Sequence, residues 1–194
     1  MSFYTVALFL HLVGVAGVFA GFGTWLFVVT ALRRAGRVEQ VRTLAGLIAL
    51  ADPVAVGSIL VLAGAGLYMA LSVWGPWTPW IGVATVGFLL IAPIGPLVIE
   101  PRMKRIVKLA DTLPDGSLPP LLVARVRDPI LGAALYTDIA LLLGAVFLMT
   151  NKPPLAESMI VIAVAAVLGV ASGLVLWWTG RRQRREAAAG ISGA

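Results

Sequence analysis

Two ionisable side chains, His11 and Asp138, lie deep inside long apolar runs of the sequence. Ionisable groups are costly in the hydrocarbon of a membrane, and where they occur they commonly mark a binding site or an ion pathway. An imidazole can serve as the axial ligand of haem iron, and a lone carboxyl group can couple the movement of protons or cations. We therefore take His11 as a candidate cofactor or metal ligand and Asp138 as a candidate proton- or ion-coupling group.

The two groups are expected at similar depths. Each lies about eight residues into its apolar run, from opposite sides, which places it roughly 12 Å from a membrane surface at 1.5 Å per residue. In a core about 30 Å thick their heights would differ by only about 6 Å. If their helices are neighbours, the groups could pair, which would lower the burial cost of both and fix the imidazole tautomer.

Small residues lie near His11 on its predicted helix face, where Gly14 and Gly21 fall within about 80° of it at 100° per residue. Glycines there could receive a second helix or could admit a flat cofactor such as haem. The same small-residue spacing occurs at Gly17 and Gly21 and at Gly169 and Gly173. Spacing alone favours helix packing. If haem binds, the candidate residues are His11, Gly14, Gly21 and Met69, the one methionine expected at a matching depth.

Five apolar runs must position these residues. Of 194 residues 60% are apolar and 12% are charged, whereas a soluble domain carries about 25% charged residues. Runs of about 20 apolar residues are predicted to cross the bilayer as helices, because unpaired backbone groups cannot face lipid. The predicted spans are residues 6–32, 54–73, 80–99, 130–149 and 158–179. We expect an all-α, polytopic transmembrane bundle over residues 1–180, with a basic cytoplasmic tail at 181–194.

The net charge of +6 is distributed between the spans. Every Lys and Arg except Lys152 follows span one, three or five, so the positive-inside rule predicts an external N-terminus and a cytoplasmic C-terminus in a bacterial inner membrane. Tyr4, Trp74, Trp77 and Trp80 fall at the predicted outer ends. These clusters indicate contact with anionic lipid rather than with nucleic acid.

Several short segments carry helix-start or helix-break signals. Asp52 with Pro53, and Asp128 with Pro129, resemble acidic caps followed by a proline in the first turn. Pro93 and Pro96 should kink or interrupt the inner half of span three. In the cytoplasmic loop 101–129, the first part is predicted to form a short amphipathic helix on the inner leaflet, followed by a turn-rich break.

The residue inventory excludes much soluble-enzyme chemistry. There is no cysteine and a single histidine, which excludes disulfides, thiolate metal sites and multi-histidine cages. No phosphate-binding loop, paired carboxylates or serine nucleophile motif is present. The sequence favours a protein that is not an enzyme.

The opening LFLHLVGVAGVFAGF and the later DIALLLGAVFLMTNKPP resemble the start and end of domain of unknown function 2269, a family of bacterial predicted integral membrane proteins. The resemblance covers roughly residues 6–154 and implies a small helical bundle. A similar histidine-containing first helix occurs in haem-linked protoporphyrinogen oxidase and in copper-resistance membrane proteins, and by that analogy His11 is the ligand position. Unlike the oxidase, this chain has no basic residue inside a later span.

Three functions remain open. The bundle could hold haem or another small cofactor near His11, as a redox accessory protein. It could be a transporter component that uses Asp138 and a cavity at the Pro93–Pro96 break. It could also be a structural or assembly subunit that binds a membrane-protein partner or a second copy of itself through its glycine faces.

Overall fold

The computed structural model describes residues 2–75 and 78–191, and within them the chain is helical, with a single isolated β-bridge between Arg37 and Ser117. Trp77 and residues 192–194 of the basic tail lie outside the described residues. The elements are α1 (Phe3–Leu32), α2 (Val38–Met69), η1 (Ala70–Trp74), α3 (Pro79–Ile91), η2 (Gly95–Ile99), α4 (Glu100–Asp111), α5 (Pro120–Val126), α6 (Pro129–Asn151) and α7 (Leu155–Ile191). The predicted all-α fold is confirmed.

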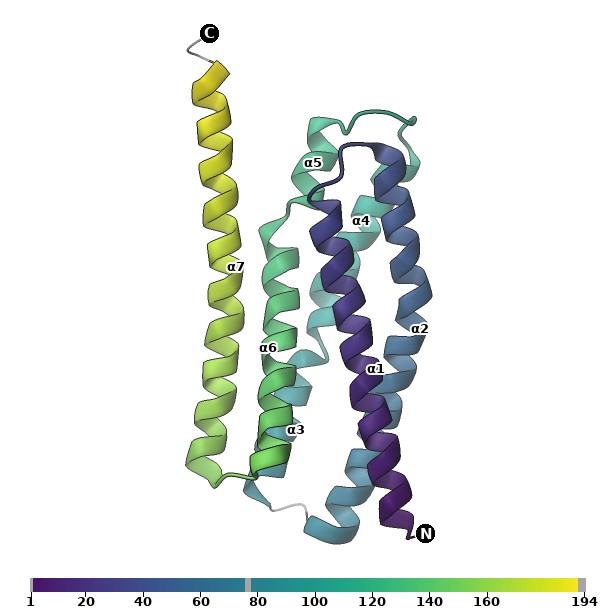
Figure 1. The fold of residues 1–194 in the computed structure, drawn as a ribbon, viewed down its shortest axis with the longest axis vertical. Helices are drawn as coiled ribbons and strands as arrows, with labels where there is room; N and C mark the ends of the chain where they lie inside the picture. Colours follow the sequence, from purple (N-terminus) through teal and green to yellow (C-terminus); the bar gives the residue numbers. More distant parts are fainter. Residues whose placement is uncertain (1, 76–77, 192–194) are drawn as a thin grey trace.

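Five segments are long and apolar enough to cross a membrane, and they lie side by side as a bundle (Figure 1). They are Phe3–Leu32, Val38–Trp74, Pro79–Asp111, Pro120–Asn151 and Leu155–Gly173. The start of α1 lies at one end, which we call the N-terminal end. Residues 33–37 and 112–128 lie at the opposite end, which we call the basic end. The predicted polytopic bundle with five spans is confirmed.

The second span begins earlier than its apolar run indicates. α2 starts at Val38, so Asp52 and Pro53 lie inside a continuous helix and do not form a helix start. The early part of α2 contains polar residues but also Val38 and Val41, which are buried. Packing of these valines, rather than lipid contact, holds this part of the helix, which is why hydropathy alone missed it.

The third span is interrupted where its prolines predict. α3 ends at Ile91, and a π-helical turn, η2, follows from Gly95 to Ile99. Proline has no amide hydrogen, so Pro93 and Pro96 cannot make the helical bond to the preceding turn.

α4 follows the break and is the predicted amphipathic helix. Its apolar face does not lie on the leaflet, because Met103, Ile106 and Ala110 are buried and the helix packs against α2 and α5.

Two helix pairs pack through glycines. A Cβ at Gly17 or Gly21 of α1 would overlap Ser58 or Ala55 of α2, and a Cβ at Gly173 of α7 would lie 2.2 Å from that of Ala133 in α6. Such close approach is possible only because these residues have no side chain. The small-residue spacing in spans one and five therefore marks the α1–α2 and α6–α7 contacts, as the packing alternative predicts.

The apolar interior forms two clusters. The basic-end cluster includes Val28, Leu32, Val41, Ile99, Ile106, Leu131 and Leu135. The N-terminal-end cluster includes Val18, Leu62, Ala84, Ile91, Leu141, Leu148 and Ile162. The third span changes partners between them, because α3 packs against α6 and α7 whereas α4 packs against α2 and α5.

Candidate functional site

Asp138 is a fully buried carboxyl group with no hydrogen-bond donor among the described residues. Its residue exposure is 0%, and neither carboxyl oxygen accepts a hydrogen bond from the part of the chain that the structure describes. Its position in α6 places it about 14 Å along the helix from Pro129. A carboxylate ion without a partner in apolar surroundings carries a large desolvation cost, so this group needs either a proton or a cation.

Apolar side chains surround Asp138 on its own helix. The residues one turn before and one turn after it are all buried: Ala134, Leu135, Leu141 and Leu142. Ala133 and Thr137 are the α6 residues that meet the glycines of α7. At 100° per residue, Asp138 lies about 120° from that contact line. Its side chain therefore faces the middle of the bundle and not α7.

The level of Asp138 is the boundary between the two apolar clusters. Leu135 belongs to the basic-end cluster, and Leu141 belongs to the N-terminal-end cluster. Phe22 of α1 packs against both clusters. In span three, Ile91 belongs to one cluster and Ile94 packs against the other, so the helix break also falls at this boundary. The carboxyl group, an aromatic ring and the break in span three thus share one level.

His11 is buried between α1 and α2. Its Nδ1 lies 3.0 Å from the carbonyl oxygen of Leu62, and the ring also adjoins Gly66 of α2. Because a carbonyl oxygen can only accept, Nδ1 donates the hydrogen, and the lone pair of the neutral ring is then on Nε2. Histidines that ligate a metal are commonly held in this way, by a hydrogen bond from the other ring nitrogen.

His11 and Asp138 do not form a pair. No hydrogen bond or ion pair joins them, since the nitrogen of His11 bonds Leu62 and the oxygens of Asp138 have no donor within the described residues. Phe22 of α1 shares the level of Asp138, at the boundary between the two clusters. His11 lies about 16 Å from Phe22 along α1. The heights of His11 and Asp138 therefore differ by about 16 Å, so the expectation of similar depth is wrong.

The glycines near His11 face α2. A Cβ at Gly14 would lie 2.8 Å from the backbone nitrogen of Leu62, and one at Gly21 would lie 2.7 Å from the Cβ of Ala55. The space beside these two glycines is therefore filled by a helix in this structure. Met69 is buried and lies one turn beyond Gly66 toward the N-terminal end, so it is within about 5 Å of the level of His11.

Comparison with known proteins assigns the sequence of this chain to a family. The model of DUF2269, described as a predicted integral membrane protein, matches residues 5–153. The chain belongs to the DUF2269 family. The matched residues contain His11, Asp138 and the break in span three, whereas α7 follows the match. No curated protein and no solved structure matches the chain.

A hydrogen bond between two side chains within the spans of this DUF2269 protein was also not predicted. The indole Nε1 of Trp25 donates a hydrogen bond of 2.9 Å to Oδ1 of Asp52. The sequence placed Asp52 at a helix start, and only the antiparallel register of α1 and α2 brings the two side chains together. The one available signal was a tryptophan inside a span without an interfacial position, since a buried indole N–H needs an acceptor.

Asp128 bonds to residues of three segments at the basic end. Its Oδ1 accepts a hydrogen bond of 2.9 Å from the amide of Ile130, which confirms the predicted cap of α6. Its Oδ2 lies 3.2 Å from Nε of Arg102, and its carbonyl oxygen accepts a bond from Arg33. Burial lowers the pKa of the Arg33 guanidinium. These contacts fix the start of α6 against α1 and α4.

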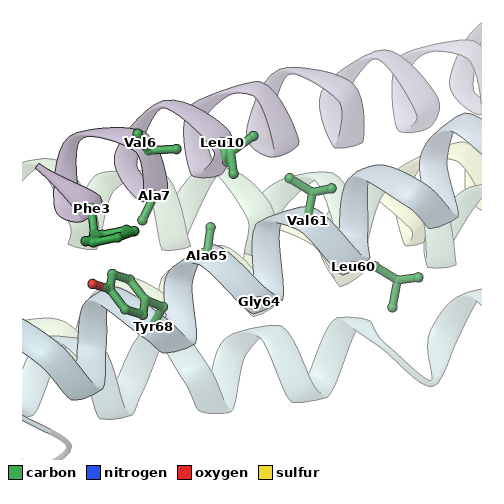
Figure 2. Close-up of a pocket in the computed structure, with 9 residues that line it drawn as sticks. All are labelled: Phe3, Val6, Ala7, Leu10, Leu60, Val61, Gly64, Ala65 and Tyr68. Carbon is green, nitrogen blue, oxygen red and sulfur yellow. The ribbon is translucent and has the colours of Figure 1, made fainter. Parts of the chain in front are cut away.

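A shallow apolar groove runs between α1 and α2 near the N-terminal end (Figure 2). Its volume is about 400 Å³, and it is lined by Phe3, Val6, Ala7, Leu10, Leu60, Val61, Gly64, Ala65 and Tyr68. His11 is not among the lining residues. The groove lies between two of the spans, and the hydroxyl group of Tyr68 is the only one among its lining residues (Figure 2).

Proposed function

We propose that this protein moves protons or monovalent cations through its bundle and that Asp138 is the group that binds them. The observation that carries this proposal is the complete burial of a carboxyl group whose two oxygens have no donor among the described residues. A structural acid in a membrane would be expected to have a basic or hydrogen-bonding partner. Asp52 in the same chain has such a hydrogen-bonding partner, because its Oδ1 accepts a hydrogen bond from the indole of Trp25.

The location of Asp138 supports transport over a static role. A group that binds an ion in transit must lie deep in the membrane and must be reachable after a conformational change. Asp138 lies at the level where span three is broken and changes its packing partners. Interrupted helices of this kind commonly border the ion sites of secondary transporters.

The test is proton flux into proteoliposomes that carry an internal pH dye, driven by a potassium diffusion potential. We expect flux above that of empty liposomes, at least a tenfold loss in Asp138→Asn, and wild-type flux in the matched control Asp111→Asn, which removes an exposed acid at the basic end. Equal flux in wild type and Asp138→Asn would overturn the proposal.

We further propose that the basic end faces the cytoplasm of a bacterial cell and contacts anionic lipid. The exposed side chains of Arg34, Arg105, Lys108, Arg125 and Arg127 gather in the segments near this end, and positive charge favours the cytoplasmic side. Because the chain has no cysteine, the variants Ser117→Cys and Asn151→Cys can be labelled individually in intact cells. An impermeant maleimide should reach position 151 and not position 117, and the reverse pattern would contradict this orientation.

A second candidate function is ligation of haem or a metal by His11. The observation that favours it is the Nδ1 hydrogen bond to Leu62, which leaves the Nε2 lone pair for a ligand. The fit is partial, because the slot expected beside Gly14 and Gly21 is filled by α2, and the described residues hold no group of three metal-ligating side chains. Haem at His11 would supply redox chemistry. A Soret band that is present in the purified protein and lost in His11→Ala would support haem ligation, and no band after haem reconstitution would exclude it.

A further inference from the structure

The surroundings of Asp138 also indicate which cation it takes. We propose that Asp138 exchanges its proton for a lipophilic organic cation, such as an amine or onium ion with apolar substituents. This inference rests on the proposed transport function and names its substrate class. It is carried by the apolar shell around a single buried carboxyl group.

A bare alkali ion is poorly matched to this shell. Such an ion gives up its water only when several oxygen atoms replace its hydration shell. Here the adjacent turns of α6 supply Ala134, Leu135, Leu141 and Leu142, none of which has a polar side-chain atom. The described residues also contain no cluster of three acidic, histidine or cysteine side chains. One carboxylate can therefore balance one positive charge but cannot rebuild a hydration shell.

A lipophilic cation has the opposite requirements. It needs one counter-charge for its nitrogen or phosphorus centre and apolar contacts for its substituents. The two apolar clusters meet at Asp138 and provide those contacts. Phe22, which packs against both clusters, places an aromatic ring at this level, and the face of a phenyl ring attracts a cation.

The bound cation needs space beside Asp138, and movement of span three would provide it. α3 and α4 are separated by the Pro93–Pro96 break and pack on different partners. The half of the span on either side of the break can therefore move with its own neighbours. Charge balances in the exchange: when movement of span three opens the site to water, one proton leaves the carboxyl group for that water and one monovalent cation takes its place.

The experiment uses tetraphenylphosphonium as the probe and the full-length protein in mild detergent. Equilibrium dialysis measures binding, and a pH dye in weak buffer measures proton release. We expect saturable binding of one cation with release of one proton, at least tenfold weaker binding in Asp138→Asn, and unchanged binding in Asp111→Asn. Phe22→Ala should weaken binding severalfold more than Phe22→Tyr. Neutral triphenylphosphine oxide should not compete.

Three results would overturn the inference. They are binding that is the same in Asp138→Asn, competition by the neutral analogue, and displacement by millimolar sodium or potassium. Elution as a monodisperse species in size-exclusion chromatography establishes that each variant is folded. If the probe does not bind but proton flux still depends on Asp138, the substrate class is wrong and the proposed function stands. If flux is independent of Asp138, the proposed function itself is wrong.

Discussion

Replacement of Gly14 by alanine tests whether the glycines near His11 exist for helix packing. The added Cβ would meet the backbone nitrogen, Cα and Cβ of Leu62 at 2.8, 2.9 and 3.0 Å, whereas ordinary contacts begin at 3.4 Å. α1 and α2 would have to separate by about half an ångström at this point. Overpacking of this kind costs about 1–3 kcal/mol, and the better helix propensity of alanine offsets about 1 kcal/mol of it. We expect Gly14→Ala to destabilise the protein by up to about 2 kcal/mol.

The matched control is Gly64→Ala, on the partner helix. Nothing lies within 4 Å of a Cβ at Gly64, so this variant should be stabilised by up to about 1 kcal/mol through helix propensity. Helicity measured by circular dichroism during titration with sodium dodecyl sulfate gives the free energy of unfolding of each variant in mixed micelles. If Gly14→Ala resists the detergent as well as Gly64→Ala does, the glycine contact does not limit the approach of the two helices, and a ligand slot becomes the better interpretation.

Three further substitutions address contacts that the structure reveals, each measured by the same titration. Trp25→Phe removes the donor to Asp52 and should cost about 1.5–3 kcal/mol, the range for a hydrogen bond to a charged group; no loss would mean that water or lipid replaces the indole. Gly116→Ala should cost about 1–3 kcal/mol, because φ is +146° there, and an unchanged variant would show that this loop has another conformation. Ser158→Ala removes the buried bond to the carbonyl of Pro153 and should cost about 1 kcal/mol; a neutral result would refute its role at the α6–α7 turn.

The sequence predicts the spans well because lipid imposes a simple rule on them. Any helix that crosses the membrane must be apolar over about 20 residues, and all five runs obey this rule. The rule fails at the start of α2, where Val38 and Val41 are held by protein rather than by lipid. The amphipathic pattern of α4 led to a second wrong prediction, a helix on the inner leaflet. Such a pattern does not state whether the apolar face meets lipid or other helices.

The candidate site is only partly visible in the sequence. Asp138 stands out because an acid in the middle of a span is rare and costly. The partner of His11 could not be predicted, since the carbonyl group of Leu62 is a backbone atom that every residue possesses. The prediction that His11 and Asp138 lie at similar heights was wrong, because residue counts within each span do not show how far one helix is shifted along the next.

The two glycine-packed hairpins bear on how the chain enters the membrane. Short connections join α1 to α2 and α6 to α7, so each antiparallel pair can close as soon as its second helix has been synthesised. In span three, α4 packs on α2, which is made earlier, whereas α3 packs on α6 and α7, which are made later. The two halves of the broken span therefore gain their neighbours at different times, because α3 has its final partners only after the α6–α7 hairpin has entered the membrane.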